Sequence, residues 1–472
     1  MPFFESPVDL FRIRRFSRSR FCNAGFANQH LNVIVDAPSI GLHKRCSRED
    51  RKGDEMDEAF QGARVDAKIG AGRPLEGIRV LTVENFIAAP FASMWLADAG
   101  AEVVKIEARE GGDFARSTSP VKADVDGKPN GLAFLRTNRN KKSVTLDLKH
   151  AEGQRLFKEL AAQADVVIEN LRPNVMDRLG IGYAELSRIN PRLIYGAISG
   201  FGHDDILSSP YGDFPAFDIV GQAMSGLMYR PERTSDRPTY LGFSLADIEC
   251  GILALYGVVL ALFHRQTTGT GKKIDISMYD ASLVLNEISV AMYSATKQTS
   301  PPGVHAVTAP FGTYRAKDGY IVIAVLGEHI WKRFADAIGR ADLTSDPRFA
   351  DGMLRKQHVH ALNVEIDAWL ADCSRESALA ILRAGGVPCS NVNDVPDLFE
   401  CPHVAARKML MTIDDPVWGH IKVAGNPVKM SDVPEPEAKT PPKLGEHNSN
   451  VLHEWLGLDE GEIGRLQALK VI

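Results

Sequence analysis

The sequence of 472 residues lacks several features that are common in metal, membrane and nucleic-acid proteins. Its six cysteines contain no C-x-x-C pair, which predicts reduced thiols in the cytoplasm and no metal site. Its longest apolar stretch, Ile252 to Phe263, is shorter than the ~18–20 residues of a membrane span, so no membrane contact is expected. The net charge of −5 gives no reason to expect nucleic acid as a partner.

The phosphate-binding loop of nicotinamide-dependent dehydrogenases is also missing. The first expected strand, at 77–83, is followed by residues 84–90, which contain no G-x-G-x-x-G pattern. Short β-branched runs nevertheless alternate with helical stretches as far as Ile198. This alternation predicts an α/β domain with a mostly parallel sheet. Further strands are expected at 101–107, 143–148, 165–169 and 192–198, with helices at 90–99 and 151–163.

The second half of the chain has a different pattern. A hairpin is expected at 311–323, turning at Asp318-Gly319, and helices follow at 331–338 and 359–372. These elements indicate a smaller α+β domain. Prolines between 427 and 442 mark an extended segment before a helix at 448–456.

The first 73 residues show no sustained periodicity, and five arginines crowd the stretch from Arg12 to Arg20. One interpretation is a cleaved targeting leader, although Glu5 and Asp9 count against it. The other is a start codon placed too far upstream, with Met56 as the first residue. Under both interpretations we expect a disordered N-terminal extension that activity does not need.

One carboxylate stands at the beginning of an apolar helix. Asp247 lies in the stretch from Ser244 to Leu255, and burying it is costly without a partner or a role. If Ser244 caps the helix, Asp247 falls in the first turn, where the helix dipole favours the ionised form. Backbone N–H groups there could hold an oxyanion. The same spacing also describes a capping box, so a structural role stays open at this point.

Several further segments follow one another in a fixed order from about Pro74 to the C-terminus. They occupy residues 74–81, 98–107, 140–147, 165–170, 177–180, 268–272, 425–427 and 444–447. Together they resemble the class III coenzyme A transferases, the family of formyl-CoA transferase and the carnitine- and bile-acid-related CoA transferases.

The resemblance implies a particular architecture. A Rossmann-like large domain is built from both chain ends, a small α+β domain is inserted between them, and two chains form an interlocked, intertwined homodimer. On this basis residues 74–295 form the first part of the large CoA-binding domain. Residues 296–411 form the small domain with its linkers, and residues 412–472 return to the large domain.

The resemblance also implies a reaction. Coenzyme A is transferred from an acyl-CoA donor to a small carboxylic acid through an aspartyl-acyl anhydride and an aspartyl-CoA thioester, with no cofactor beyond CoA. Asp247 occupies the position of the catalytic aspartate. An acyl-CoA racemase and a non-catalytic acyl-CoA binder are the alternatives. Phe217 stands where the family's racemases carry an acid/base histidine, which disfavours the racemase because phenylalanine cannot titrate.

The remaining candidate residues come from the same resemblance. Lys149 and Arg178 have the alternative of being ordinary exposed cations, Arg178 in a surface ion pair. Asp218 is expected near the substrate, where it orients the acceptor or the CoA thiol end, unless it only caps the helix that follows it. His203 is expected to be a solvated loop residue. The candidate contacts to CoA are Ala88, Leu146, Lys149, Asn170, Leu171 and Arg178.

Overall fold

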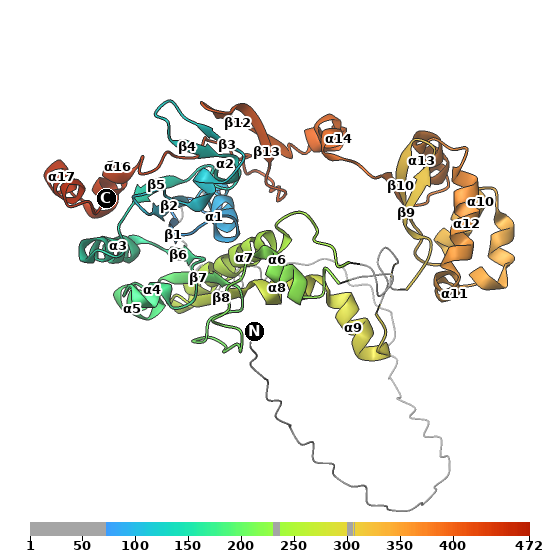
Figure 1. The fold of residues 1–472 in the computed structure, drawn as a ribbon, viewed down its shortest axis with the longest axis horizontal. Helices are drawn as coiled ribbons and strands as arrows, with labels where there is room; N and C mark the ends of the chain where they lie inside the picture. Colours follow the sequence, from blue (N-terminus) through green and yellow to red (C-terminus); the bar gives the residue numbers. More distant parts are fainter. Residues whose placement is uncertain (1–71, 230–236, 300–304, 306) are drawn as a thin grey trace, which may run out of the picture. The chain divides into compact units, whose positions relative to one another are not determined.

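The computed structural model describes residues 72–229, 237–299, 305 and 307–472. Six parallel strands form its main sheet, in the order β5-β2-β1-β6-β7-β8 (Figure 1). This confirms the expected α/β class with a parallel sheet. The prediction of a disordered N-terminal extension falls almost entirely outside the described residues. The strands are β1 (Arg79–Val83), β2 (Glu102–Glu107), β5 (Lys142–Thr145), β6 (Val166–Glu169), β7 (Ile194–Ser199) and β8 (Lys273–Ser277).

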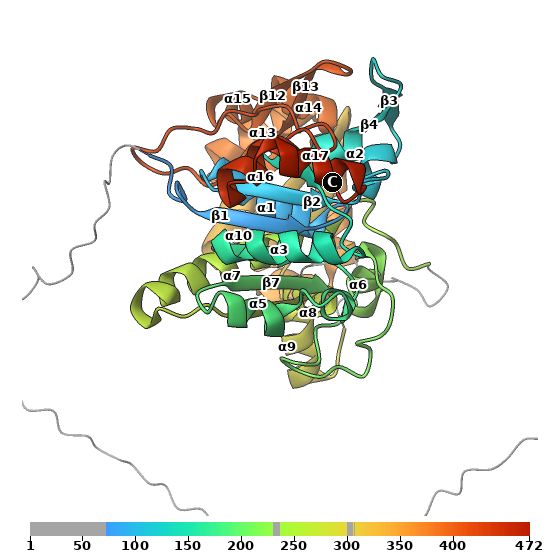
Figure 2. The same cartoon turned by 90° about the vertical axis from the view of Figure 1, so that its left-hand side faces the viewer.

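Helices cover both faces of this sheet, so its strands are buried on both sides. In β1, the neighbouring residues Val80 and Leu81 point to opposite faces and are both fully buried. Leu81 packs with α3 (Ala151–Gln163), α5 (Tyr183–Ile189), α16 (Asn448–Leu456) and α17 (Glu460–Ala468) (Figure 2). Val80 packs with α1 (Ala88–Asp98), α7 (Leu245–Thr268) and α8 (Met278–Leu285). The last residues of the chain therefore share a core with its first strands.

The strand order reverses between β1 and β6. From this pair, the chain builds outward through β2 and β5 on one side and through β7 and β8 on the other. In open α/β sheets, ligands bind at the carboxyl ends of the strands where such a reversal occurs. The residues that follow Val83 and Glu169 are therefore the first place to look for a binding site.

Helix α7 is longer and more apolar than the sequence led us to expect. It is long and apolar enough to cross a membrane by length and composition alone, so the expectation that no such segment exists is wrong. The error arose because Asp247 and Glu249 interrupt the run of apolar letters without ending the helix. Cys250, Ala254 and Val258 are fully buried against the sheet.

A second sheet belongs to the later part of the chain. Strands β9 (Phe311–Ala316) and β10 (Gly319–Ala324) form the expected hairpin, and β11 (Cys389–Asn391) pairs with β10. Its core includes Trp331, Phe334 and Phe349. The hairpins β3 (Val121–Ala123)–β4 (Pro129–Gly131) and β12 (Leu410–Asp415)–β13 (Gly419–Ala424), like α17, were not expected. The other helices are α2 (Leu132–Leu135), α4 (Val175–Arg178), α6 (Asp218–Met224), α9 (Glu287–Thr296), α10 (Glu328–Ala337), α11 (Gly352–Gln357), α12 (Val359–Leu370), α13 (Arg375–Ala384), α14 (Val395–Glu400) and α15 (Pro402–Ala406).

Candidate active site

Asp247 lies in the first turn of α7, as the sequence predicted, and only 8% of it is exposed. Ser244 occupies the N-cap position but makes no capping hydrogen bond with its side chain. The predicted cap by Ser244 and the alternative capping box are therefore both wrong. The Asp247 side chain is left without a local structural task.

Asp218 replaces Ser244 as the cap of α7. Its Oδ1 accepts hydrogen bonds from the backbone N–H groups of Ala246 (2.7 Å) and Asp247 (3.2 Å). Its Oδ2 accepts from Gln222 Nε2 (2.6 Å) and the Tyr240 hydroxyl (3.4 Å). Asp218 therefore caps α7 and not α6, which begins at Asp218 itself. It also occupies two of the N–H groups that had been candidates for an oxyanion site.

The two carboxylates set the electrostatics of this site. Burial and the nearby charge of Asp218 raise the pKa of Asp247 to about 7, while Arg136 acts in the opposite direction. Asp247 has no direct ion pair with any of the described residues. A buried carboxylate that titrates near neutral pH beside a like charge is typical of a functional site.

Phe217 directly precedes Asp218 in the chain. It occupies the N-cap position of α6, and 77% of it is exposed. Its side chain offers an apolar surface beside the buried Asp218, and it has no group that can transfer a proton.

The point where the strand order reverses carries two of the predicted CoA contacts. Asn170 follows β6, and its amide exchanges two hydrogen bonds, each 2.8 Å long, with the backbone N–H and C=O of Asn85. Three residues later, the buried Ala88 begins α1. A Cβ atom on Gly251 would lie 2.8 Å from the Ala88 carbonyl oxygen, so glycine allows α7 to approach α1 closely. Asn170 and Ala88 thus lie on neighbouring segments, after β6 and after β1, and Ala88 contacts α7, the helix of Asp247.

Two further predicted contacts, Leu171 and Arg178, follow β6 in the chain. The backbone N–H of Leu171 donates to Glu169 Oε2 (2.7 Å), which fixes the turn after β6. Arg178 is exposed at the end of α4. Its guanidinium has no carboxylate partner in the described part of the chain, so the predicted surface ion pair is not found. The side chain remains available to pair with a phosphate.

The last two predicted CoA contacts, Leu146 and Lys149, follow β5 in the chain. Leu146 is 2% exposed and belongs to the core, so only its backbone can face a ligand. Lys149 is exposed in the turn before α3. Because β2 and β1 lie between β5 and β6, these two residues stand further along the carboxyl edge than Asn170.

A buried ionic network braces the loop after β1, and the sequence analysis missed it. Lys141 Nζ lies 2.8 Å from Glu84 Oε1, and Lys105 Nζ lies 2.7 Å from Asp113 Oδ2. Lys105 also donates to the Glu84 carbonyl oxygen, and Asp113 accepts from the N–H of Phe86. Phe86 has a φ of +68°, a strained value for a bulky residue that these bonds help to hold. The sequence signal for this network was Lys105, a lysine inside a buried parallel strand.

His203 is not the solvated loop residue that was expected. It is 5% exposed, and its Nδ1 lies 2.8 Å from Asp275 Oδ1 while its Nε2 lies 3.6 Å from Glu169 Oε1. Burial alone would lower the pKa of His203, but the hydrogen bonds to these carboxylates raise it to about 9. The cationic ring therefore links β8 to the end of β6, where it supports the turn that carries Leu171.

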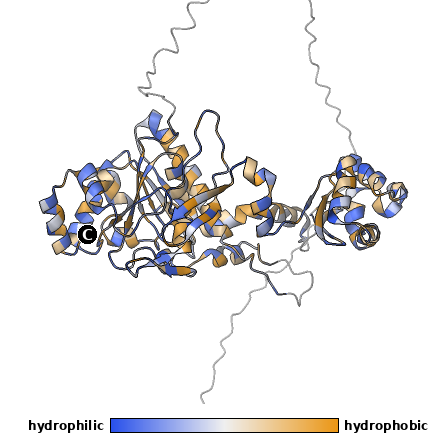
Figure 3. Ribbon diagram, turned by 90° about the horizontal axis from the view of Figure 1, so that it is seen from above, coloured by the Kyte–Doolittle hydropathy of each residue, from blue (hydrophilic) through white to orange (hydrophobic). Residues whose placement is uncertain are grey.

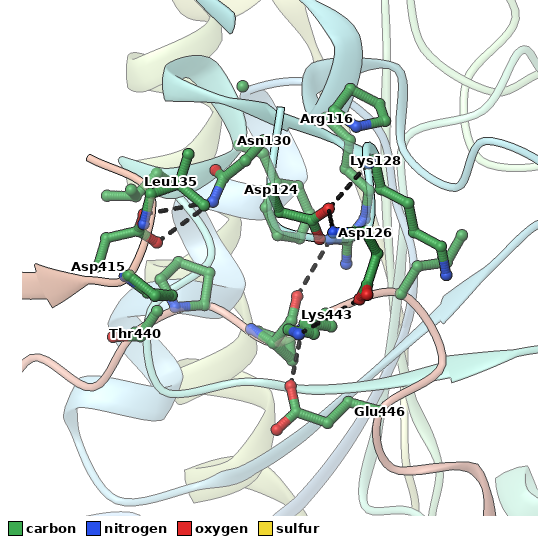
Figure 4. A pocket seen from close by; sticks show the side chains of 18 of the residues that line it. Arg116, Asp124, Asp126, Lys128, Asn130, Leu135, Asp415, Thr440, Lys443 and Glu446 are labelled. Atoms are coloured by element: carbon green, nitrogen blue, oxygen red, sulfur yellow. Dashed lines mark hydrogen bonds and ion pairs between the residues drawn. The ribbon is translucent and has the colours of Figure 1, made fainter. Parts of the chain in front are cut away.

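A cavity of about 770 Å³ lies elsewhere, and none of the predicted site residues lines it. It is bounded by the β3–β4 hairpin, α2 and residues 440–446 (Figure 4). Several of its polar groups are paired: the Asn130 amide bonds to Asp415, and Lys443 Nζ lies 3.9 Å from Asp126. The cavity and the unusual carboxylate Asp247 therefore lie in different places. We assign the candidate active site by the chemistry of Asp247.

Comparisons with known proteins agree with this assignment. The sequence model of CoA-transferase family III matches residues 75–448. The succinyl-CoA–L-malate CoA-transferase beta subunit of Chloroflexus aurantiacus is 36% identical over 405 residues, which are 84% of this chain and 98% of that protein. The succinyl-CoA:mesaconate CoA-transferase of Haloarcula hispanica is 35% identical over 384 residues, covering 80% of this chain and 96% of that protein. The crystal structure of a CAIB/BAIF family protein from Brucella suis superimposes with a TM-score of 0.70 and 31% identity, covering 81% of this chain and all of that one. The chain therefore belongs to CoA-transferase family III and is a class III CoA-transferase.

Proposed function

We propose that this protein exchanges coenzyme A between an acyl-CoA and a small carboxylic acid, with Asp247 as the nucleophile. One observation carries the proposal: Asp247 is a buried carboxylate with a pKa of about 7 and no ion-pair partner among the described residues. A poorly solvated carboxylate that ionises near neutral pH is suited to attack a thioester.

The proposed reaction has four steps. The Asp247 carboxylate attacks the thioester carbonyl, the C–S bond breaks, and a mixed anhydride and CoA thiolate result. The thiolate then attacks the aspartyl carbonyl, which releases the donor acid and leaves an aspartyl-CoA thioester. The carboxylate of the acceptor acid attacks this thioester, giving a second anhydride and CoA thiolate. Attack of the thiolate on the acceptor's carbonyl releases the new acyl-CoA and restores Asp247.

In this proposal, CoA binds along the carboxyl edge of the main sheet. Arg178 and Lys149 are exposed cations that can pair with phosphates, while Asn170 and Leu171 position the turn beside them. The pantetheine arm then runs past Ala88 toward the first turn of α7. Phe217 supplies apolar surface, and Asp218 orients the nucleophile through the backbone of Ala246 and Asp247.

The substrates are proposed to be short dicarboxylic acids and their CoA thioesters. Two relatives are named for transfer from succinyl-CoA, one to L-malate and the other to mesaconate. These acids all carry a second carboxylate beside the one that reacts. A racemase has no support, because Phe217 cannot serve as one of the two acid/base groups.

A homodimer is part of the proposal. Apolar side chains remain exposed on α7, α8 and α9, among them Tyr256 (61% exposed), Phe263 (69%) and Val284 (62%). The ribbon coloured by hydropathy shows hydrophobic and hydrophilic residues side by side along the helices (Figure 3). Exposed apolar surface of this kind marks an interface in soluble proteins. A second copy of the chain is the proposed cover. The cytoplasmic location and the absence of a cofactor beyond CoA stay predictions.

An exchange assay with defined variants tests the function. Asp247→Ala should lose CoA exchange by at least about 1000-fold, as expected for loss of a covalent nucleophile, while its affinity for CoA changes little. Glu249→Gln, on the same helix two residues away, is the matched control and should retain exchange. Full activity of Asp247→Ala would refute the proposed mechanism. Incorporation of solvent deuterium at the α-carbon of the acyl group without CoA exchange would indicate a racemase instead. Binding of acyl-CoA without either reaction would indicate a non-catalytic binder.

A further inference from the structure

Arg136 is a cation without a partner beside the candidate active site. It directly follows α2 as the C-cap residue, and its side chain is exposed. Its guanidinium forms no ion pair with any of the described residues. The next arginine along the chain is different, because Arg139 is fully buried and binds Asp98 at 2.6 Å. An exposed, unpaired arginine has its donors free for a ligand.

A set of buried hydrogen bonds fixes the position of Arg136. Lys141 Nζ donates to the carbonyl oxygen of Pro90 in α1 and to Asn138 Oδ1, both at 2.9 Å. Asn138 Nδ2 donates to the carbonyl oxygen of Phe134 in α2, also at 2.9 Å. These bonds tie the turn that carries Arg136 back to α2 and also to the first turn of α1.

The same part of α1 packs against the start of α7. A Cβ atom on Gly251 would lie 3.0 Å from the Phe91 ring and 2.8 Å from the Ala88 carbonyl oxygen. Gly251 is one helical turn beyond Asp247. The contacts of α1 therefore bring the Arg136 turn and the Asp247 turn to the same region.

The charges of the two groups interact across this region. Partial burial lowers the pKa of Arg136, the Asp247 carboxylate opposes that effect, and Arg136 in turn favours the ionised form of Asp247. The two side chains nevertheless form no direct ion pair. Neither group is occupied by the other, so both are available to a bound substrate.

We propose that Arg136 is a specificity-determining residue that binds the second, non-reacting carboxylate of a dicarboxylic acyl group or acceptor. The inference rests on the proposed function, since it assumes that the acyl carbonyl reacts at Asp247. An acid with a short spacer places its far carboxylate toward Arg136 while its near carboxyl carbon meets Asp247. The guanidinium binds a carboxylate through two parallel hydrogen bonds. An acyl group without that carboxylate leaves Arg136 in water and gains nothing from it.

The test compares two donors of similar length, succinyl-CoA and butyryl-CoA, which differ in the far carboxylate. We measure kcat/KM for both donors with wild type, Arg136→Gln, Arg136→Lys and Arg407→Gln. Arg407 is the matched control, because it is also an exposed arginine at the C-cap of a short helix, α15, without a side-chain partner in the described chain. The assay is run at a pH well above 7, where Asp247 is ionised in every variant. For Arg136→Gln we expect kcat/KM with succinyl-CoA to fall by roughly 10- to 150-fold, the range for one lost charge-assisted interaction, and butyryl-CoA to be unaffected at that pH. Arg136→Lys should recover part of the loss, and Arg407→Gln should change neither donor.

Several outcomes would overturn the inference. An equal fall with both donors would mean that Arg136 acts on the CoA moiety or on Asp247 and not on the far carboxylate. An unchanged preference for succinyl-CoA in Arg136→Gln would remove Arg136 from substrate recognition. Failure of the proposed function is distinguishable, because wild type would then show no exchange with either donor.

Discussion

Two groups of buried acids in this protein have opposite surroundings. Glu84, Glu107 and Asp113 lie near the ends of β1 and β2, and each contacts a lysine or an arginine directly. Burial alone would raise the pKa of Glu84, but Lys141 and Lys105 hold it below its usual value. Asp247 lies beside another carboxylate instead, and its pKa is raised.

The difference separates a positioning role from a reactive one. Paired acids are stabilised as anions, and their hydrogen bonds hold the loop that runs from Glu84 to Ala88. Asp247 is maintained as a poorly stabilised anion, which is the condition that a nucleophile needs. The comparison predicts that removing a paired acid damages stability, whereas removing the unpaired acid damages activity.

The largest effect on stability is expected for Glu84→Gln. This change removes the charge that offsets Lys141 and Lys105, both of which have fully buried side chains. Breaking a buried ion pair from one side typically costs about 3–5 kcal/mol, and chemical denaturation measures this loss. Glu102→Gln is the control, because its carboxylate pairs with Lys142 where both side chains are about 30% exposed, and it should lose less. Equal losses for the two variants would contradict a special role of the network.

Asp247→Asn should instead be more stable than wild type at high pH. The folded-state pKa of Asp247, about 7, lies above the ordinary value of 3.8. Its contribution to stability is therefore fully present below pH 3.8 and is lost as the pH rises through about 7. We expect the melting temperature of Asp247→Asn to exceed that of wild type by a few degrees at pH 8 and by less at pH 5. A variant that melts lower at both pH values would show that Asp247 is a structural acid.

The smallest effect is expected for Asp218→Asn. The variant keeps an oxygen that can accept from the N–H groups of Ala246 and Asp247, but it removes the like charge that raises the pKa of Asp247. The acid limb of the kcat/KM profile should therefore move to lower pH, by roughly one unit as for an interaction with a single nearby charge. Arg136→Gln should move the same limb to higher pH. A common direction in the two variants would contradict the electrostatic account.

Some of this site could be predicted from the sequence, and some could not. The alternation of strands and helices indicated the parallel sheet, and the position of Asp247 in the first turn of its helix followed from local spacing. The cap by Asp218 could not be predicted, because it joins residues 28 and 29 positions apart. The burial of His203 depends in the same way on Asp275, 72 residues later.

The ionic network and Arg136 show a second limit. Lys105 is a charge in an apolar strand, but its partners Glu84 and Asp113 come from two other places in the chain. Arg136 and Arg139 are three residues apart and look alike in the sequence, yet one is exposed and unpaired while the other is buried against Asp98. Only the path of the chain after α2 distinguishes them.

The most direct test traps the covalent intermediate. The enzyme is incubated with succinyl-CoA and treated with borohydride, which reduces an aspartyl thioester to an alcohol, and its peptides are mapped by mass spectrometry. The account predicts that Asp247 is converted to homoserine in wild type and that Glu84, Asp218 and Glu249 are unmodified. Modification at another acid, or active exchange with Asp247 unmodified, would contradict it.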